Sequence, residues 1–187
     1  MEKAVFVCAH GAGGHMDDRG MTSLAQALEP VGFEVVRFNF PYREKGSKRP
    51  DPMPVLKECI ATVARRVAHE SKPKKLILGG RSMGGRAASM LAADGFECDG
   101  LLLLAYPLHP AGQPEKLRDA HLPKISIPVL CFNGTRDALC TRELMERTVA
   151  DLPPWQMHWL EGATHSFRER DYREIAEISR AWLARLG

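Results

Sequence analysis

The chain has 187 residues, of which 44% are hydrophobic and 26% are charged, and its formal net charge is +3. This balance is typical of a globular protein with a full core and predicts one domain over residues 1–187. The small, scattered positive charge argues against a nucleic-acid partner. No stretch approaches the roughly 20 apolar residues that cross a membrane, so no membrane association is expected.

The cysteines and the N-terminus both bear on the compartment. The five cysteines are widely spaced and form no CxxC pair, which predicts reduced thiols and no zinc site. Cys8 and Cys131 lie inside apolar runs, where we expect them to be buried rather than catalytic. The first apolar run, 4–9, is short and ends in His10-Gly11 rather than in a cleavage site, so no secretory signal is predicted. The expected location is cytoplasmic.

Short apolar runs alternate with helical patterns along the chain. In chain order, the predicted elements are a strand at 4–9, a helix at 21–28, a strand at 33–40, a helix at 55–70, a strand at 75–79, a helix from Ser82 to about 93, strands at 101–106 and 128–133, a helix at 142–150 with Thr141 as its N-cap, a strand at 155–160 and a helix at 172–186. Segments 41–54 and 107–125 are expected to be irregular.

This alternation predicts an α/β fold: about six mostly parallel strands with helices on both faces. In such a sheet, functional groups gather beyond the carboxyl ends of the strands. The loops that follow the strands are therefore the places where a site is expected.

One such loop carries the pentapeptide Gly80-Arg81-Ser82-Met83-Gly84, which matches G-x-S-x-G between a strand and a helix. The pattern predicts a sharp, strained turn that presents Ser82 as a nucleophile, with glycine required at 80 and 84 to avoid collisions. Gly79 and Gly85 are expected to let the helix pack closely on the sheet. A plain glycine turn is the alternative, and a phosphate-binding loop is disfavoured because the Gly-Lys-Ser/Thr ending is missing.

A nucleophilic serine needs a base, and the base needs an acid that orients it. Asp137 follows the fifth predicted strand and His165 follows the sixth, in the order nucleophile, acid, histidine. Asp119 and Asp151 are less well placed as the acid. Taken singly, Asp137 could be a turn residue and His165 a surface histidine, but together with Ser82 they predict a catalytic triad.

The loop 10–14, with the sequence HGAGG, follows the first strand and resembles loops that help to form an oxyanion hole. We expect the backbone N–H groups of Ala12 and Met83 to stabilise the oxyanion. A dinucleotide-binding loop would need glycine at position 16, where Met16 stands. His10 is expected to organise the turn rather than to take part in the chemistry.

At these motifs the sequence resembles a small α/β-hydrolase without a lid, similar to the dienelactone-hydrolase-like proteins. It also resembles the uncharacterised hydrolases related to subunit three of the NSL histone-acetyltransferase complex. The resemblance covers HGAGG, FNFPYRE, GGRSMGGR, AYPLHPAGQPEKLRDAHLP, NGTRD and GATHSF. It implies an α/β-hydrolase fold that lacks the first two strands and has its cap domain reduced to 107–125. By the same resemblance, Ser82, Asp137 and His165 are nucleophile, acid and base.

The sequence therefore predicts a serine hydrolase that cleaves a carboxylic ester or thioester through an acyl-serine intermediate. A hydrolase-fold scaffold without catalysis and an amide-cleaving enzyme are the alternatives. The expected partner is a small-molecule acyl substrate; no metal or other cofactor is implied and no protein partner is indicated. Four residues flank the predicted rim, as pocket residues or as packing residues: Met16, Tyr106, His109 and Phe167.

Overall fold

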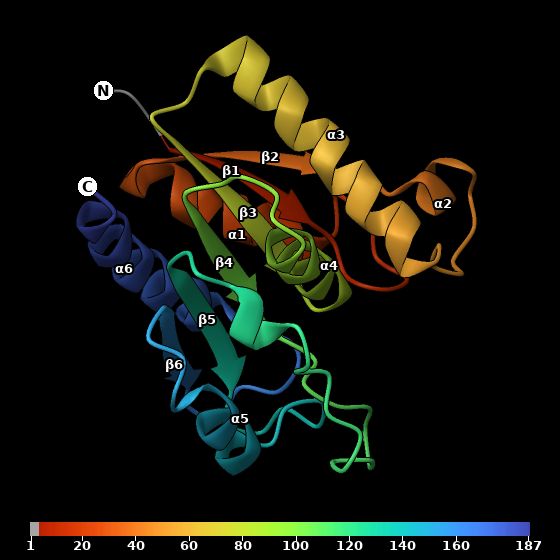
Figure 1. The fold of residues 1–187 in the computed structure, drawn as a ribbon, viewed down its shortest axis with the longest axis vertical. Helices are drawn as coiled ribbons and strands as arrows, with labels where there is room; N and C mark the ends of the chain where they lie inside the picture. Colours follow the sequence, from red (N-terminus) through yellow and green to blue (C-terminus); the bar gives the residue numbers. More distant parts are fainter. Residues whose placement is uncertain (1–3) are drawn as a thin grey trace.

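The computed structural model describes residues 4–187, and a six-stranded sheet lies at its centre (Figure 1). The strands are β1 (Ala4–Ala9), β2 (Phe33–Phe38), β3 (Lys75–Arg81), β4 (Gly100–Leu104), β5 (Val129–Gly134) and β6 (Trp155–Leu160). Their order is β2-β1-β3-β4-β5-β6, and every neighbouring pair is parallel. The chain reverses direction across the sheet between β1 and β3, which is where such folds place their sites.

Helices connect the strands. They are α1 (Arg19–Leu28), α2 (Pro41–Glu44), α3 (Met53–Ser71), α4 (Met83–Ala93), α5 (Arg142–Val149) and α6 (Glu169–Arg185), with short 3₁₀ helices at Glu29–Val31 and Leu122–Lys124. The predicted strands and helices are all present. The turn α2 was expected to be irregular; it begins at Pro41, whose fixed φ suits the first helical position.

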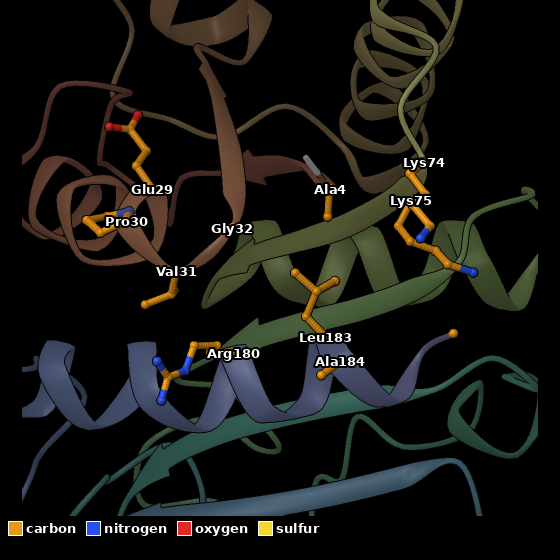
Figure 2. A pocket seen from close by; sticks show the side chains of 11 residues that line it. Ala4, Glu29, Pro30, Val31, Gly32, Lys74, Lys75, Arg180, Leu183 and Ala184 are labelled. Atoms are coloured by element: carbon orange, nitrogen blue, oxygen red, sulfur yellow. The ribbon is translucent and has the colours of Figure 1, made fainter. Parts of the chain in front are cut away.

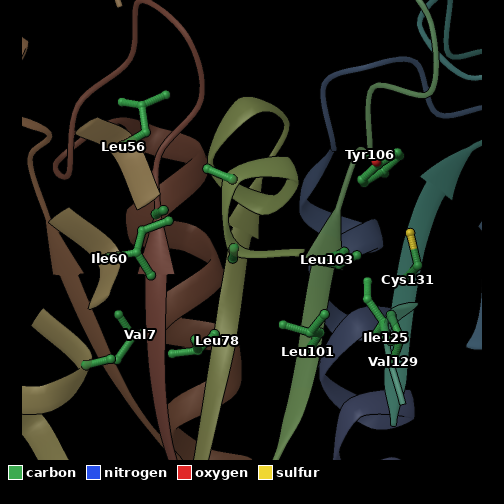
Figure 3. Close-up of a cluster of buried hydrophobic side chains, with 14 of the residues drawn as sticks. Val7, Leu56, Ile60, Leu78, Leu101, Leu103, Tyr106, Ile125, Val129 and Cys131 are labelled. Carbon is green, nitrogen blue, oxygen red and sulfur yellow. The ribbon is translucent and has the colours of Figure 1, made fainter. Parts of the chain in front are cut away.

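Two apolar layers sandwich the sheet, because alternate strand residues point to opposite faces. Val7, Leu78 and Leu103 face the layer that α3 and α4 cover, where Leu56 and Ile60 of α3 pack (Figure 3). The strand residues between them face α1 and α6 on the other side. These opposite-facing residues include Phe6, Cys8, Ile77, Leu102 and Leu104. The predicted helices on both faces are thus confirmed.

Three boundaries differ from the prediction for identifiable reasons. β2 ends at Phe38 rather than at 40, because the Phe40 N–H leaves the ladder and donates to the His10 ring. α6 begins at Glu169 rather than at 172, because the Asp171 carboxylate accepts the Arg168 N–H and caps the first turn. Thr141 does occupy the N-cap position of α5, but its side chain makes no bond to that helix.

No cap domain covers the carboxyl ends of the strands in residues 4–187, as predicted. The segment 107–125 contains a single 3₁₀ turn and packs on the fold through Leu108, Leu122 and Ile125, all of which are buried. Across residues 4–187, none of the helices combines the length and apolar character that a membrane crossing requires.

Candidate active site

Ser82 lies at the corner between β3 and α4 in a strained conformation, with φ 50° and ψ −118°. A non-glycine residue at positive φ is uncommon, and strain of this kind is held in place by its surroundings. A Cβ at Gly80 would lie 2.1 Å from the Ala9 carbonyl oxygen, and one at Gly84 would lie 2.5 Å from the His10 oxygen. The predicted strained corner is confirmed, and both glycines are needed because the backbone at the end of β1 and at His10 approaches so closely.

The flanking glycines differ from each other. A Cβ at Gly85 would lie 2.6 Å from the Gly80 oxygen, so this residue does let α4 approach the sheet. A Cβ at Gly79 would lie 1.9 Å from the Leu102 oxygen of β4. The prediction for Gly79 was therefore wrong: its missing side chain permits strand pairing, with φ at 153°, rather than helix packing.

The structure brings the three predicted residues into one chain of hydrogen bonds. The Ser82 Oγ lies 2.8 Å from Nε2 of His165, and Nδ1 of His165 lies 2.8 Å and 3.0 Å from the two Asp137 carboxylate oxygens. Because a carboxylate only accepts, Nδ1 donates to Asp137, which leaves Nε2 free to accept from the serine hydroxyl. The Asp137 side chain is fully buried, whereas Ser82 and His165 are partly exposed to solvent.

The Asp137 carboxylate has two further donors. The Leu139 N–H donates to Oδ1 at 2.8 Å, and the side-chain amide of Asn133 donates to Oδ2 at 3.4 Å. Asn133 is fully buried at the end of β5. Sequence reasoning did not single it out, because Tyr106, whose carbonyl also accepts from its amide at 3.0 Å, lies 27 positions earlier in the chain.

The loop after β1 lies beside the serine. A Cβ at Gly11 would come within 3.5 Å of the Ser82 Cβ, so this loop contacts the nucleophile corner. Within residues 4–187, neither the Ala12 N–H nor the Met83 N–H has a hydrogen-bond acceptor. Both amides remain free for a ligand, and the Met83 amide is at the positive end of α4.

His10 is fully buried and fixes this loop. The Phe40 N–H donates to its Nε2 at 3.1 Å, so the ring proton is on Nδ1, which donates to the Gly11 oxygen at 2.8 Å. Burial lowers the pKa of His10 and so favours this neutral form. These contacts agree with the predicted turn-organising role.

Two of the four predicted rim residues are packing residues. Tyr106 is fully buried and its hydroxyl donates to the Arg118 carbonyl at 2.8 Å. His109 is also buried, and its Nε2 accepts the Thr141 N–H at 3.0 Å. Met16 and Phe167 are partly exposed.

Cys8 and Cys131 are both fully buried, as predicted. Burial raises the pKa of Cys8 to about 12 and raises that of Cys131 well above its usual range, so both remain thiols. Among the described residues, no group of three or more His, Cys, Asp or Glu side chains is arranged to hold a metal ion.

A cavity of about 490 Å³ lies at the opposite end of the sheet from Ser82 (Figure 2). Its wall includes Ala4 and Lys75 at the starts of their strands, and Leu183 of α6. It is therefore separate from the candidate site, which lies at the carboxyl ends of the strands.

Comparisons with known proteins support the fold. The model of the alpha/beta hydrolase domain family matches residues 2–181. An alpha-beta serine hydrolase homologue from Coxiella burnetii is 25% identical, with a TM-score of 0.76 over 95% of this chain and 85% of that one. An α/β serine hydrolase without a lid from Xanthomonas campestris is 23% identical, with a TM-score of 0.75 over 97% and 82%.

A dienelactone hydrolase from Anabaena variabilis is 19% identical, with a TM-score of 0.76 over 98% of this chain and 86% of that one. The predicted fold, and the predicted resemblance to lid-less hydrolases and dienelactone hydrolase, are thereby confirmed. The narrower resemblance to proteins related to the NSL subunit stays a prediction.

Proposed function

The chain belongs to the alpha/beta hydrolase domain family, and from that premise we propose that it is a serine hydrolase that cleaves carboxylic esters or thioesters. The observation that carries the proposal is the continuous hydrogen-bond chain from Ser82 through His165 to the buried Asp137 carboxylate. The Coxiella burnetii relative, described as a serine hydrolase homologue, supports the same chemistry.

In the acylation step, Nε2 of His165 takes the proton from the Ser82 hydroxyl as Oγ attacks the carbonyl carbon of the substrate. The Ala12 and Met83 amides donate to the oxyanion, and each such donor is typically worth about 3–4 kcal/mol in the transition state. Asp137 holds the imidazole tautomer and stabilises its cation. The imidazolium then gives its proton to the leaving alcohol or thiol, and the acyl group remains on Ser82.

In the deacylation step, His165 takes a proton from water as the water oxygen attacks the acyl-serine carbonyl. The same two amides hold the second oxyanion. Collapse of this intermediate releases the carboxylic acid, and the proton on Nε2 returns to the Ser82 oxygen. No step needs a group beyond these side chains, the two amides and water.

Because no cap domain covers the strand ends within residues 4–187, the partly exposed Ser82 is open to acyl groups that enter from solvent. The proposal therefore favours a small or protruding acyl substrate over one that must be enclosed.

A fluorophosphonate probe and p-nitrophenyl acetate test the proposal together. The wild-type protein should be labelled at Ser82, and Ser82→Ala should lose labelling and about 10⁴-fold or more of the activity. Ser23→Ala removes a partly exposed serine from α1 and is the control, expected to behave as wild type. Folded protein that is neither labelled nor active would refute the proposal and favour a binding or scaffold role.

A further inference from the structure

Arg81 connects the candidate nucleophile to the loop that carries the candidate base. It stands between Gly80 and Ser82 at the end of β3. Its Nη2 donates to the His165 carbonyl oxygen at 2.8 Å and lies 3.4 Å from the Ser166 hydroxyl. The residue next to Ser82 therefore binds the backbone of His165 itself, 84 positions along the chain.

The backbone of residues 164–167 makes few other hydrogen bonds. Its other hydrogen bonds are local ones between Thr164 and Ser166. Among residues 4–187, Arg81 is the one residue outside the segment that makes a hydrogen bond to its backbone. Thr164 and Ser166 are exposed, and Phe167 packs against Tyr172 at the end of the segment, which leaves Arg81 as the donor to the His165 backbone itself.

The Arg81 guanidinium makes its hydrogen bonds to His165 and Ser166. It forms no ion pair with any carboxylate among the described residues. A charged donor to a carbonyl oxygen makes a stronger bond than a neutral donor does. With no competing acid, the bond to His165 is the one that orients this side chain.

Because Gly20 of α1 has no side chain, there is space beside it for the Arg81 guanidinium. A Cβ at Gly20 would lie 2.8 Å from Nη1 of Arg81 and 3.2 Å from the Tyr172 hydroxyl. A side chain at position 20 would therefore displace the guanidinium while leaving Arg81 itself in the chain.

We propose that Arg81 is a positioning residue that sets the separation of Nε2 of His165 from Oγ of Ser82 by anchoring the 164–167 backbone. This inference rests on the proposed hydrolase function. It assigns Arg81 no contact with substrate: the residue acts through His165. Because misplacing a catalytic group by about 1 Å costs on the order of 10²-fold in rate, loss of the anchor should be visible in turnover.

The test compares Arg81→Ala with Arg19→Ala, which removes an equal charge from an exposed arginine at the start of α1. The readouts are kcat and KM for p-nitrophenyl acetate, and hydrogen exchange of a peptide that spans 161–168. We expect Arg81→Ala to lower kcat on the order of 10²-fold with KM within about twofold, and to exchange faster at 164–167. Arg19→Ala should match wild type in both readouts.

Gly20→Ala is the second variant. Alanine has a higher helix propensity than glycine, so α1 should not be weakened. The kcat should nevertheless fall, and hydrogen exchange at 164–167 should become faster. If Arg81→Ala does not fold, this variant decides the question with the same two readouts.

Wild-type kcat in Arg81→Ala overturns the proposal. So does a fall in kcat without faster exchange at 164–167, because the guanidinium would then act on the substrate rather than through the loop. If the wild-type chain itself shows no Ser82 labelling and no turnover, the proposed function fails separately. The exchange comparison still decides the anchor: faster exchange upholds it and unchanged exchange overturns it.

Discussion

The Asn133 side chain connects the Asp137 carboxylate to the end of β4. Its Nδ2 donates to Oδ2 of Asp137 at 3.4 Å and to the Tyr106 carbonyl at 3.0 Å, while its Oδ1 accepts the Tyr106 N–H at 3.2 Å. All three residues are buried, so water cannot replace these bonds. Asn133 thus satisfies the backbone that leaves β4 and holds the proposed acid with the same amide group.

Asn133→Leu keeps the shape of the side chain and removes every one of these bonds. The buried Tyr106 N–H is then left without a partner and the Tyr106 carbonyl keeps only the Leu108 N–H, which should lower the free energy of unfolding by roughly 1–3 kcal/mol. Activity should also fall in the fraction that remains folded, because Asp137 loses a donor. Urea unfolding followed by tryptophan fluorescence measures the stability, and p-nitrophenyl acetate hydrolysis measures the activity.

Gln156→Leu is the control for this variant. Gln156 lies on β6 and its amide makes one exposed contact, with Arg185. Its loss should change the stability by no more than about 0.5 kcal/mol. Equal stability of the two variants would show that the Asn133 bonds to Tyr106 do not stabilise the fold.

Local patterns were enough to predict the strands and the residues that follow them. Ser82, Asp137 and His165 each lie just beyond a strand, and parallel strands bring their carboxyl ends to one edge of the sheet. Asn133 and Arg81 also stand beside these residues in the sequence. Their partners lie 27 and 84 positions away, so no spacing rule marks them.

The element boundaries were missed for a similar reason. The end of β2 depends on a bond from Phe40 to His10, which lies 30 positions earlier and which strand propensity does not reveal. The start of α6 was predictable in principle, because Asp171 caps the Arg168 N–H across three residues. Arginine is not a usual N-cap residue, and the pattern was therefore not recognised.

Gly84→Ala tests the close approach of the Ala9-His10 backbone, at the end of β1, to the serine corner. Gly84 lies in α4, where alanine would normally favour the helix. Here the new Cβ would lie 2.5 Å from the His10 oxygen and 2.6 Å from the Ala9 oxygen, and neither backbone atom can move freely. We expect a loss of stability of about 3 kcal/mol, measured by thermal or urea unfolding.

The matched control is Gly20→Ala, another helical glycine. Its new Cβ would meet the mobile end of Arg81 rather than backbone, so its stability should stay near that of wild type. A Gly84→Ala protein as stable as wild type would mean that the corner can open without cost.

Asp137→Asn tests the role of the carboxylate in setting the tautomer of His165. An amide placed where the carboxylate lies, 2.8 Å from Nδ1, can donate to that nitrogen. The proton would then move to Nε2, which could no longer accept from Ser82. If the proposed function is right, kcat should fall on the order of 10⁴-fold while the fold is retained.

The control for Asp137→Asn is Asp151→Asn, which alters an exposed carboxylate in the turn before β6. Steady-state kinetics with p-nitrophenyl acetate, together with circular dichroism, compare the two variants. Retention of more than about a tenth of wild-type activity in Asp137→Asn would remove Asp137 from the mechanism.

His121 should make the protein sensitive to acid. Its Nε2 lies 2.8 Å from the Ser89 hydroxyl of α4. Burial, with a smaller contribution from the Arg86 cation, lowers the pKa of His121 from 6.5 to about 4, although Asp94 and Asp119 oppose the shift. In the unfolded chain the ring keeps its ordinary pKa. Between these two values the unfolded state binds more protons, so the free energy of unfolding falls as the pH decreases from 6.5 towards 4.

His121→Gln removes the titrating ring and keeps an amide that can bond Ser89. Between pH values of about 7 and 4, this variant should therefore lose less stability than wild type does. The expected difference is about 1–2 kcal/mol, because water screens the exposed part of the ring. Urea unfolding across this pH range measures it, with His69→Gln, an exposed histidine of α3, as the control. The buried His10 contributes equally to all three proteins and cancels from the comparison. Stability curves for wild type and His121→Gln that run parallel through this range would show that folding does not suppress the charge on His121.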